Sequence, residues 1–211
     1  MIGAAMHRFR QILLVALAAG IAAGCGISRP MNYYVLETPT PPEQPAEPEF
    51  PVTLLVARVT SSELYREDRL VFSSSPVELG TYEYQRWAEP PVDMIQDELI
   101  ASLRATAQFR AVSRVASNTR GDYVLRTHLY ALDEVDKPQM AAHFSIQLEL
   151  YDLKSASTVW SDSYSHDEPV SGKKVDDVVE ALNQDVKDGM NQVASHLTQY
   201  FASHPPAKSG Q

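Results

Sequence analysis

Residues 143–153 read HFSIQLELYDL, and this stretch alternates apolar and polar side chains. The apolar members, which share one set of alternate positions, are Phe144, Ile146, Leu148 and Leu150. Successive side chains of a β-strand point to opposite faces of the sheet. The alternation therefore predicts a strand with one face in the core and the other in water, as in an antiparallel sheet.

The segments on either side of this strand continue the pattern. Residues 123–135 also alternate, and residues 158–166 follow after a turn at residues 154–157. Because short turns join antiparallel neighbours, these three segments predict a meander. Shorter segments upstream, rich in β-branched or aromatic residues, predict further strands at residues 33–36, 52–59, 70–74, 77–84 and 109–115.

Two segments carry apolar side chains every three or four residues, the spacing of one face of an α-helix. The first begins at Pro90 and Pro91, because a proline suits the first helical turn, and is expected to end near Gln108. The second covers residues 175–204, and its long apolar stripe is typical of a helix that packs along a sheet. We therefore predict an α+β fold, a two-layer sandwich in which two helices pack on one face of a mostly antiparallel sheet.

The charge of the chain limits its partners. It contains 18 basic and 27 acidic side chains among 211 residues, and its formal net charge is −9. Because phosphate neutralisation dominates affinity for nucleic acid, an acidic chain without a basic block is not expected to bind it. The single cysteine, Cys25, excludes an intrachain disulfide and a cysteine metal cluster.

Sequence motifs for catalysis are missing. The nine glycines are scattered and form no phosphate-binding loop, and neither G-x-S-x-G nor H-E-x-x-H occurs. We therefore predict no catalytic residue, metal or cofactor, and expect that the chain is not an enzyme. His128 and His143 fall on neighbouring predicted strands, where they either approach each other or are simply exposed. A Ser–His–Asp triad assembled from distant segments also stays open.

The N-terminus has the pattern of an export signal. Residues 1–24 contain no acidic side chain, with a short positive region at residues 7–10 and then 13 apolar or small residues at 12–24. A membrane-spanning helix needs about 20 such residues, so this run predicts a cleaved signal peptide rather than a stable anchor.

The small residues before Cys25 resemble the lipobox of bacterial lipoproteins, although Ala22 stands where leucine is usual. This resemblance implies cleavage after Gly24 and acylation of Cys25. Gly26 replaces the aspartate that favours retention in the inner membrane, so the resemblance implies sorting to the outer membrane. The alternative is an ordinary signal peptide that leaves a free thiol.

Composition divides the chain into four regions. Residues 1–24 form the signal peptide, and residues 25–51 form the acylated N-terminus, a short strand and a proline-rich segment. Residues 52–204 form the folded domain, and residues 205–211 a disordered tail. The six prolines between residues 39 and 51 favour a stiff, extended connector.

Residues 82–91, YEYQRWAEPP, place a tryptophan and opposite charges directly before the first helix. One interpretation is that Trp87 fills the core where strand meets helix. Arg86 then pairs with Glu89 or Asp68. The other interpretation is a partner-binding edge, because tryptophan and arginine dominate the binding energy of interfaces. The candidate partner-binding residues are Asp68, Arg69, Arg86, Trp87 and Glu89.

Four motifs together resemble the ABC-type transport auxiliary lipoproteins, the PqiC-like group. They are the lipobox at Cys25, Y-Y-x-L at residues 33–36, D-R-L-V-F at residues 68–72 and R-W-A-E-P at residues 86–90. The similarity covers the mature chain. It implies a non-enzymatic lipoprotein on the periplasmic face of the outer membrane.

The resemblance also implies a partner. Such lipoproteins accompany an ABC ATPase, a permease and a protein with a mammalian-cell-entry (MCE) domain. We therefore expect the domain to dock an MCE assembly to the outer membrane for lipid transport, and self-association into a homo-oligomer stays open. One alternative is a lipid-binding module with a cavity lined by Phe144, Ile146, Leu182 and Met190. The other is an envelope hydrolase.

Overall fold

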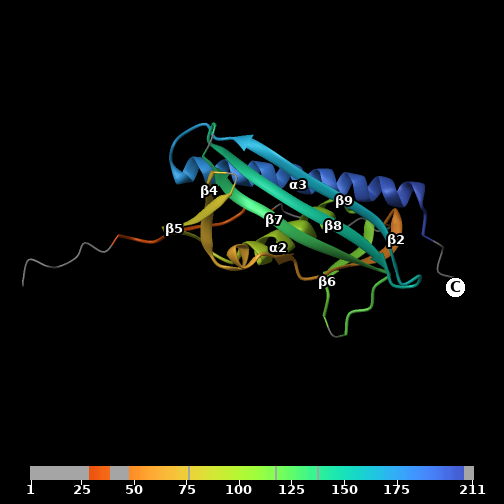
Figure 1. Cartoon of the computed structure of the whole chain (residues 1–211). Helices are drawn as coiled ribbons and strands as arrows, with labels where there is room; N and C mark the ends of the chain where they lie inside the picture. Colours follow the sequence, from red (N-terminus) through yellow and green to blue (C-terminus); the bar gives the residue numbers. More distant parts are fainter. Residues whose placement is uncertain (1–28, 39–47, 76, 117, 137, 207–211) are drawn as a thin grey trace, which may run out of the picture. The chain divides into compact units, whose positions relative to one another are not determined.

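The computed structural model describes residues 29–38, 48–75, 77–116, 118–136 and 138–206 (Figure 1). The chain divides into two units, residues 1–30 and residues 31–211, and every helix and strand of the described residues belongs to the second. The expected signal peptide, Cys25 and most of the proline-rich segment lie outside the described residues, as do residues 207–211 of the expected tail.

The elements follow the predicted order of strands, helix, strands, helix. In chain order they are β1 (Asn32–Tyr34), β2 (Phe50–Val56), β3 (Thr60–Ser61), the 3-10 helix η1 (Glu63–Arg66), β4 (Arg69–Ser75), β5 (Glu78–Trp87), α2 (Pro91–Ala105), β6 (Phe109–Arg114), β7 (Tyr123–Val135), β8 (Ala141–Asp152), β9 (Ser157–Pro169) and α3 (Val175–Ser203). Helix α2 ends before Gln108, because Ala107 has a φ of 54°, in the left-handed region.

Strand β7 is the axis of the sheet. One edge of β7 pairs antiparallel with β8, and β8 pairs antiparallel with β9, so the predicted meander is confirmed. The other edge pairs in parallel with β2, β3 and β4, at the start, middle and end of β7. Strand β6 extends the sheet beyond β2, and β5 and β1 extend it beyond β4.

The α+β class is confirmed, and the longest ladders are antiparallel. The shorter parallel ladders were not predicted, because the sequences of the short strands β2, β3 and β4 do not indicate which strand each of them pairs with. The chain from Phe50 to Ser75 runs in the same direction as β7, so β2, β3 and β4 pair in parallel with successive segments of it. Between β2 and β3, the side-chain amide of Gln96 on α2 donates a hydrogen bond to the Ala57 carbonyl at 2.9 Å.

Both helices cover one face of the sheet and share one hydrophobic core. Helix α3 packs on β8 and β9, whereas α2 packs on β6 and contacts α3 (Figure 1). The buried side chains of β8 are the alternate apolar residues that predicted the strand. The sheet face away from the helices carries the polar set, as the alternation requires.

Helix α3 holds a buried carboxylate against the sheet. Asp185 is fully buried, and its Oδ2 accepts a hydrogen bond from the Phe144 N–H at 3.0 Å. Its Oδ1 accepts one from the Tyr164 hydroxyl at 2.6 Å and lies 3.0 Å from His166 Nδ1. Burial raises the pKa of Asp185 above its ordinary value, although these hydrogen bonds favour the ionised form. The carboxylate thus links one turn of α3 to both β8 and β9.

Gly189, one turn further along α3, lets the helix approach the sheet at this point. A Cβ at this position would lie 2.8 Å from a ring carbon of Tyr164 and 2.9 Å from one of Phe144. Both rings are buried in the core, so neither can swing into solvent.

We predict that Gly189→Ala destabilises the domain. Overpacking typically costs about 1–3 kcal/mol, whereas alanine gains at most about 1 kcal/mol over glycine in a helix. Urea unfolding should therefore show a lower midpoint for this variant. Ser195→Ala is the control, because Ser195 is exposed on the same helix. A midpoint for Gly189→Ala equal to that of the control would contradict the close approach.

Candidate functional site

The residues proposed for partner binding meet where β1, β4 and β5 join. Arg86 Nη1 donates a hydrogen bond to Asp68 Oδ1 at 2.6 Å, and the Trp87 N–H donates to the Asp68 carbonyl, also at 2.6 Å. Arg69 lies opposite Arg86 in the β4–β5 ladder. Glu89 is exposed two residues after Trp87. The fold therefore brings four of the five candidates together, with Glu89 beyond the end of β5.

Trp87 lies in the core, with 1% of its surface exposed. It belongs to the same hydrophobic cluster as Val92 and Ile95 of α2. Its indole Nε1 is buried and has no hydrogen-bond partner among the described residues. This is the position that the core interpretation predicts, with Arg86 paired to Asp68.

The charged candidates keep part of their side chains in water. The side chain of Arg69 is 43% exposed and that of Asp68 is 40% exposed, against 17% for Arg86. A partner-binding edge at this junction therefore offers Asp68, Arg69 and Glu89 to a partner. Their role in binding remains a prediction.

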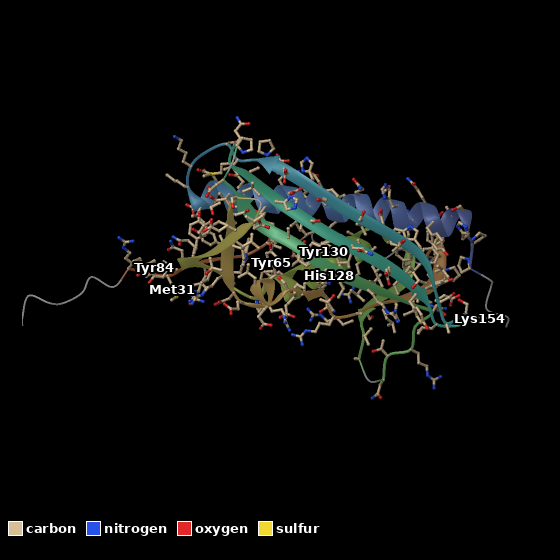
Figure 2. The ribbon with its side chains drawn as sticks, viewed as in Figure 1. Met31, Tyr65, Tyr84, His128, Tyr130 and Lys154 are labelled. Atoms are coloured by element: carbon tan, nitrogen blue, oxygen red, sulfur yellow. The ribbon has the colours of Figure 1, made fainter. Side chains whose placement is uncertain are left out.

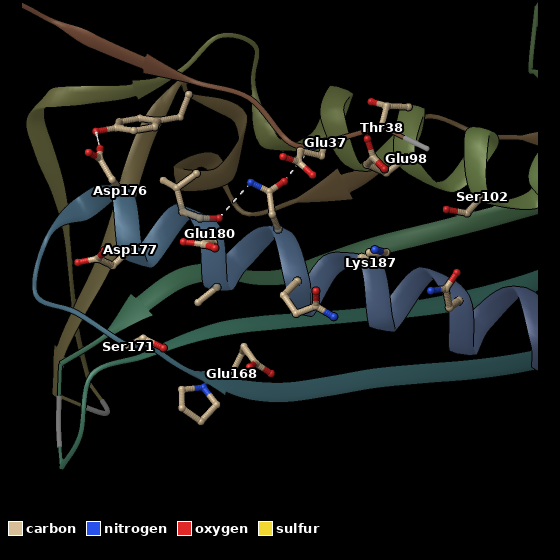
Figure 3. Close-up of a pocket in the computed structure, with 17 residues that line it drawn as sticks. Glu37, Thr38, Glu98, Ser102, Glu168, Ser171, Asp176, Asp177, Glu180 and Lys187 are labelled. Atoms are coloured by element: carbon tan, nitrogen blue, oxygen red, sulfur yellow. Dashed lines mark hydrogen bonds between the residues drawn. The ribbon is translucent and has the colours of Figure 1, made fainter. Parts of the chain in front are cut away.

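A cleft of about 850 Å³ lies on the side of β1 that faces α3, and Tyr34 is part of its lining. Its walls come from residues 34–38, α2, α3 and the loop that follows β9 (Figure 3). The charged residues of its lining are Glu37, Glu98, Glu168, Asp176, Asp177, Glu180 and Lys187. Because six of these seven are acidic, we call it the acidic cleft.

Hydrogen bonds to α3 hold residues 34–38 along one wall of the acidic cleft. The Tyr34 hydroxyl donates to Asp176 Oδ1 at 2.8 Å, and burial with this contact raises the pKa of Tyr34 to about 12. The Glu37 N–H donates to Asn183 Oδ1 at 2.7 Å. Asn183 Nδ2 in turn donates to the Val179 carbonyl within α3 (Figure 3). The segment is therefore fixed at both of its ends.

Glu98 of α2 is the buried carboxyl of the acidic cleft, with 4% of its surface exposed. Burial raises the pKa of Glu98, the hydrogen bond with Thr38 lowers it, and the charge of Asp97 raises it. The net direction is upward, which favours the neutral acid relative to an exposed glutamate. The more exposed carboxylates, such as Glu37 and Glu180, supply the negative charge at the surface.

The described residues contain histidine–aspartate pairs, but no hydrogen bond joins a serine hydroxyl to any of them. The pairs are His143–Asp167, His166–Asp185 and His196–Asp162. The hydroxyl of Ser203 lies 3.1 Å from His204 Nδ1, but that nitrogen also faces the Tyr200 carbonyl at 3.1 Å instead of a carboxylate. No group of three metal-ligating side chains occurs among the described residues.

The lipid-cavity alternative loses support. Phe144, Ile146, Leu182 and Met190 are each at most 1% exposed and belong to the packed core, so they do not form the wall of a lipid cavity. The acidic cleft is lined by other residues.

Of the two interpretations of His128 and His143, the structure excludes a mutual approach. His128 lies opposite Gln147 in the β7–β8 ladder, whereas His143 lies opposite Asp133, further along the same ladder. His128 Nδ1 instead lies 2.9 Å from the Thr60 hydroxyl. Register, which a single sequence does not report, separates the two side chains.

Sequence reasoning missed Asp185 and the residues that form the acidic cleft. A signal for Asp185 was present, because it lies three residues after Leu182 and four before Gly189, within the apolar stripe of α3. A carboxylate on a buried stripe must find hydrogen-bond partners. No local signal marks Glu37 and Asn183, which are 146 positions apart in the chain.

We predict that Trp87→Ala lowers the unfolding free energy by about 3–5 kcal/mol, the usual cost of removing a buried tryptophan. The control Arg69→Ala removes a half-exposed side chain from the same junction and should change it by less than about 0.5 kcal/mol. Urea unfolding of both variants checks this. A stable Trp87→Ala domain that no longer recovers a partner would overturn the core assignment.

Comparison with solved structures identifies the fold. Protein XCC0632 from Xanthomonas campestris, of the DUF330 family, superposes with a TM-score of 0.72 at 22% identity, over 82% of this chain and 99% of that one. A second crystal structure, of an uncharacterized protein, gives a TM-score of 0.64 at 16% identity, over 80% and 99%. At these identities the likeness concerns the fold alone. No curated protein matches this chain.

Among the described residues, no helix combines the length and apolar character needed to cross a membrane. The family model of the ABC-type transport auxiliary lipoprotein component matches residues 34–194, which is most of the chain and nearly all of the folded unit. The chain therefore belongs to the family of ABC-type transport auxiliary lipoprotein components.

Proposed function

We propose that this chain is a periplasmic lipoprotein anchored to the outer membrane, and that it is the accessory component of an ABC/MCE-type lipid transport system. Its task is to dock the MCE-domain protein to that membrane. The observation that carries the proposal is the family match over residues 34–194. The lipobox at Cys25, shortly before the match, supports the anchor.

The acyl group must supply the membrane affinity in this proposal. Without Arg8 and Arg10 the mature chain keeps 16 basic and 27 acidic side chains, so its overall charge repels anionic lipid. Each buried CH₂ group contributes about 0.8 kcal/mol, so several acyl chains on Cys25 outweigh that repulsion. Gly26 supports the outer membrane as the destination.

We assign docking to the acidic cleft. Complementary charge speeds association and selects partners, so a cleft with six acidic side chains favours a partner with basic groups. Glu37 and Glu180 are exposed at its surface, where a partner can reach them. The exposed charges of the Arg69 junction, on Asp68, Arg69 and Glu89, are the alternative docking surface to the acidic cleft.

We assign lipid carriage to the MCE protein rather than to this domain. The apolar side chains between α3 and the sheet are buried and packed against one another. A close-packed core has no room for an acyl chain without rearrangement. The domain then acts through position and charge, with no catalytic step of its own.

The anchor predicts the behaviour of Cys25→Ser. This variant should move from the membrane fraction to the soluble fraction of the periplasm, because nothing replaces the acyl chains. Gly26→Asp is the matched control, since it keeps the acylated cysteine and should redirect the protein to the inner membrane. Sucrose-gradient fractionation measures both. A Cys25→Ser variant that stays in an alkali-resistant membrane fraction contradicts the anchor.

The docking assignment predicts a charge effect. Glu37→Lys with Glu180→Lys should reduce recovery of the MCE-domain protein from crosslinked envelopes by about tenfold or more, since attraction at the acidic cleft becomes repulsion. Glu78→Lys with Glu83→Lys on β5 is the control, because it makes the same change in net charge at exposed positions outside the cleft. Equal recovery with both double variants would exclude the cleft as the docking site.

A further inference from the structure

An apolar row lies on the outward side of the β1 segment. Met31 is 46% exposed, Tyr33 is 62% exposed and Val35 is 60% exposed. They alternate with Tyr34 and Leu36, which point to the other side, and Leu36 is buried. Strand β1 is at the edge of the sheet, and Figure 2 shows Met31 at the same end as Tyr84 of β5. The row therefore presents three neighbouring apolar side chains to the surroundings.

The charges on β4 and β5 next to the apolar row are paired. Tyr33 lies opposite Arg86 on β5, and Arg86 lies opposite Arg69 on β4, so the three side chains share one face of the sheet. Arg86 pairs with Asp68 at 2.6 Å, and Arg69 lies 4.0 Å from Glu67. An anionic surface therefore meets little net repulsion from these strands, although the whole chain is acidic. Glu37, two residues after Val35, lines the acidic cleft.

The chain between Cys25 and Met31 is short. Five residues lie between them, so the six Cα-to-Cα steps of an extended chain span about 21 Å at most. If Cys25 is held at a bilayer, Met31, the first residue of the apolar row, cannot lie further from that surface than this distance. Tyrosine is enriched at membrane–water interfaces, where its ring is in the apolar boundary and its hydroxyl in water.

We propose that the apolar row of Met31, Tyr33 and Val35 contacts the lipid surface of the membrane that holds Cys25. This contact deepens the proposed function and rests on its anchor. It adds a second point of attachment to the acyl anchor, and two points orient the domain. Since Tyr33 and Tyr34 point to opposite sides of β1, the acidic cleft then opens away from the bilayer, towards the partner.

The test uses the full acylated chain in vesicles of phosphatidylethanolamine and phosphatidylglycerol. The Val35→Cys variant carries an NBD label on residue 35, since acylation leaves Cys25 unreactive. The control is Val115→Cys, labelled in the same way at a position that is 50% exposed and outside the row. We expect about tenfold weaker quenching by aqueous iodide at residue 35 than at residue 115, together with quenching by brominated acyl chains at residue 35 alone.

Three results would overturn the proposal, and they are distinguishable. Equal iodide quenching at residues 35 and 115 in vesicle-bound protein excludes the lipid contact but leaves the anchor intact. Shielding of residue 35 that disappears when the protein is diluted into more lipid identifies a second copy as the occupant. Protein that never enters the vesicle fraction contradicts the anchor itself, and the proposed function with it. Circular dichroism confirms that both labelled variants are folded.

Discussion

The buried carboxylate of Asp185 fixes the position of α3 on the sheet. Leaving a buried carboxyl group without its hydrogen-bond partners costs about 1–3 kcal/mol or more, so a helix that rotated or slid by one residue would lose that amount. The bonds from the Phe144 N–H and the Tyr164 hydroxyl allow one register only. Gly189 then lets the helix backbone close onto the same two rings. This contact and the buried apolar stripe of α3 together set the register of the helix.

The acidic cleft depends on that register. Asp176 and Asn183 lie on the same helix as Asp185, and they bind the segment that contains Tyr34 and Glu37. The far side of this segment is held by the β1–β5 ladder, in which Tyr34 lies opposite Trp87, and by a hydrogen bond from the Ala88 N–H to the Tyr34 carbonyl. The short strand β1 is thus held from both sides, by β5 and by α3. An edge strand of three residues would otherwise contribute too few hydrogen bonds to stay in place.

The sequence predicted those features that a local pattern reports. The alternation in β8 reveals its buried face residue by residue, and the apolar stripe of α3 does the same for a helix. Parallel pairing on β7 and the offset between His128 and His143 depend on tertiary register, which no local pattern carries. The acidic cleft could not be predicted for the same reason, since its walls come from segments that are far apart in the sequence. Trp87 could be predicted in part. Its sequence neighbours indicated an important position, but they did not indicate whether its side chain faces the core or a partner.

The alternation of β1 separates two surfaces with different electrostatic requirements. An acidic surface is repelled by anionic headgroups, whereas an apolar row flanked by paired charges is not. If both surfaces were on one side of the strand, contact with the membrane would bring Glu37 and Asp176 against lipid phosphate. Because Tyr33 and Tyr34 are adjacent and point to opposite sides, the apolar row and the acidic cleft are separated. An accessory protein without catalytic chemistry can then contribute through orientation, by holding one side on lipid and presenting the other to its partner.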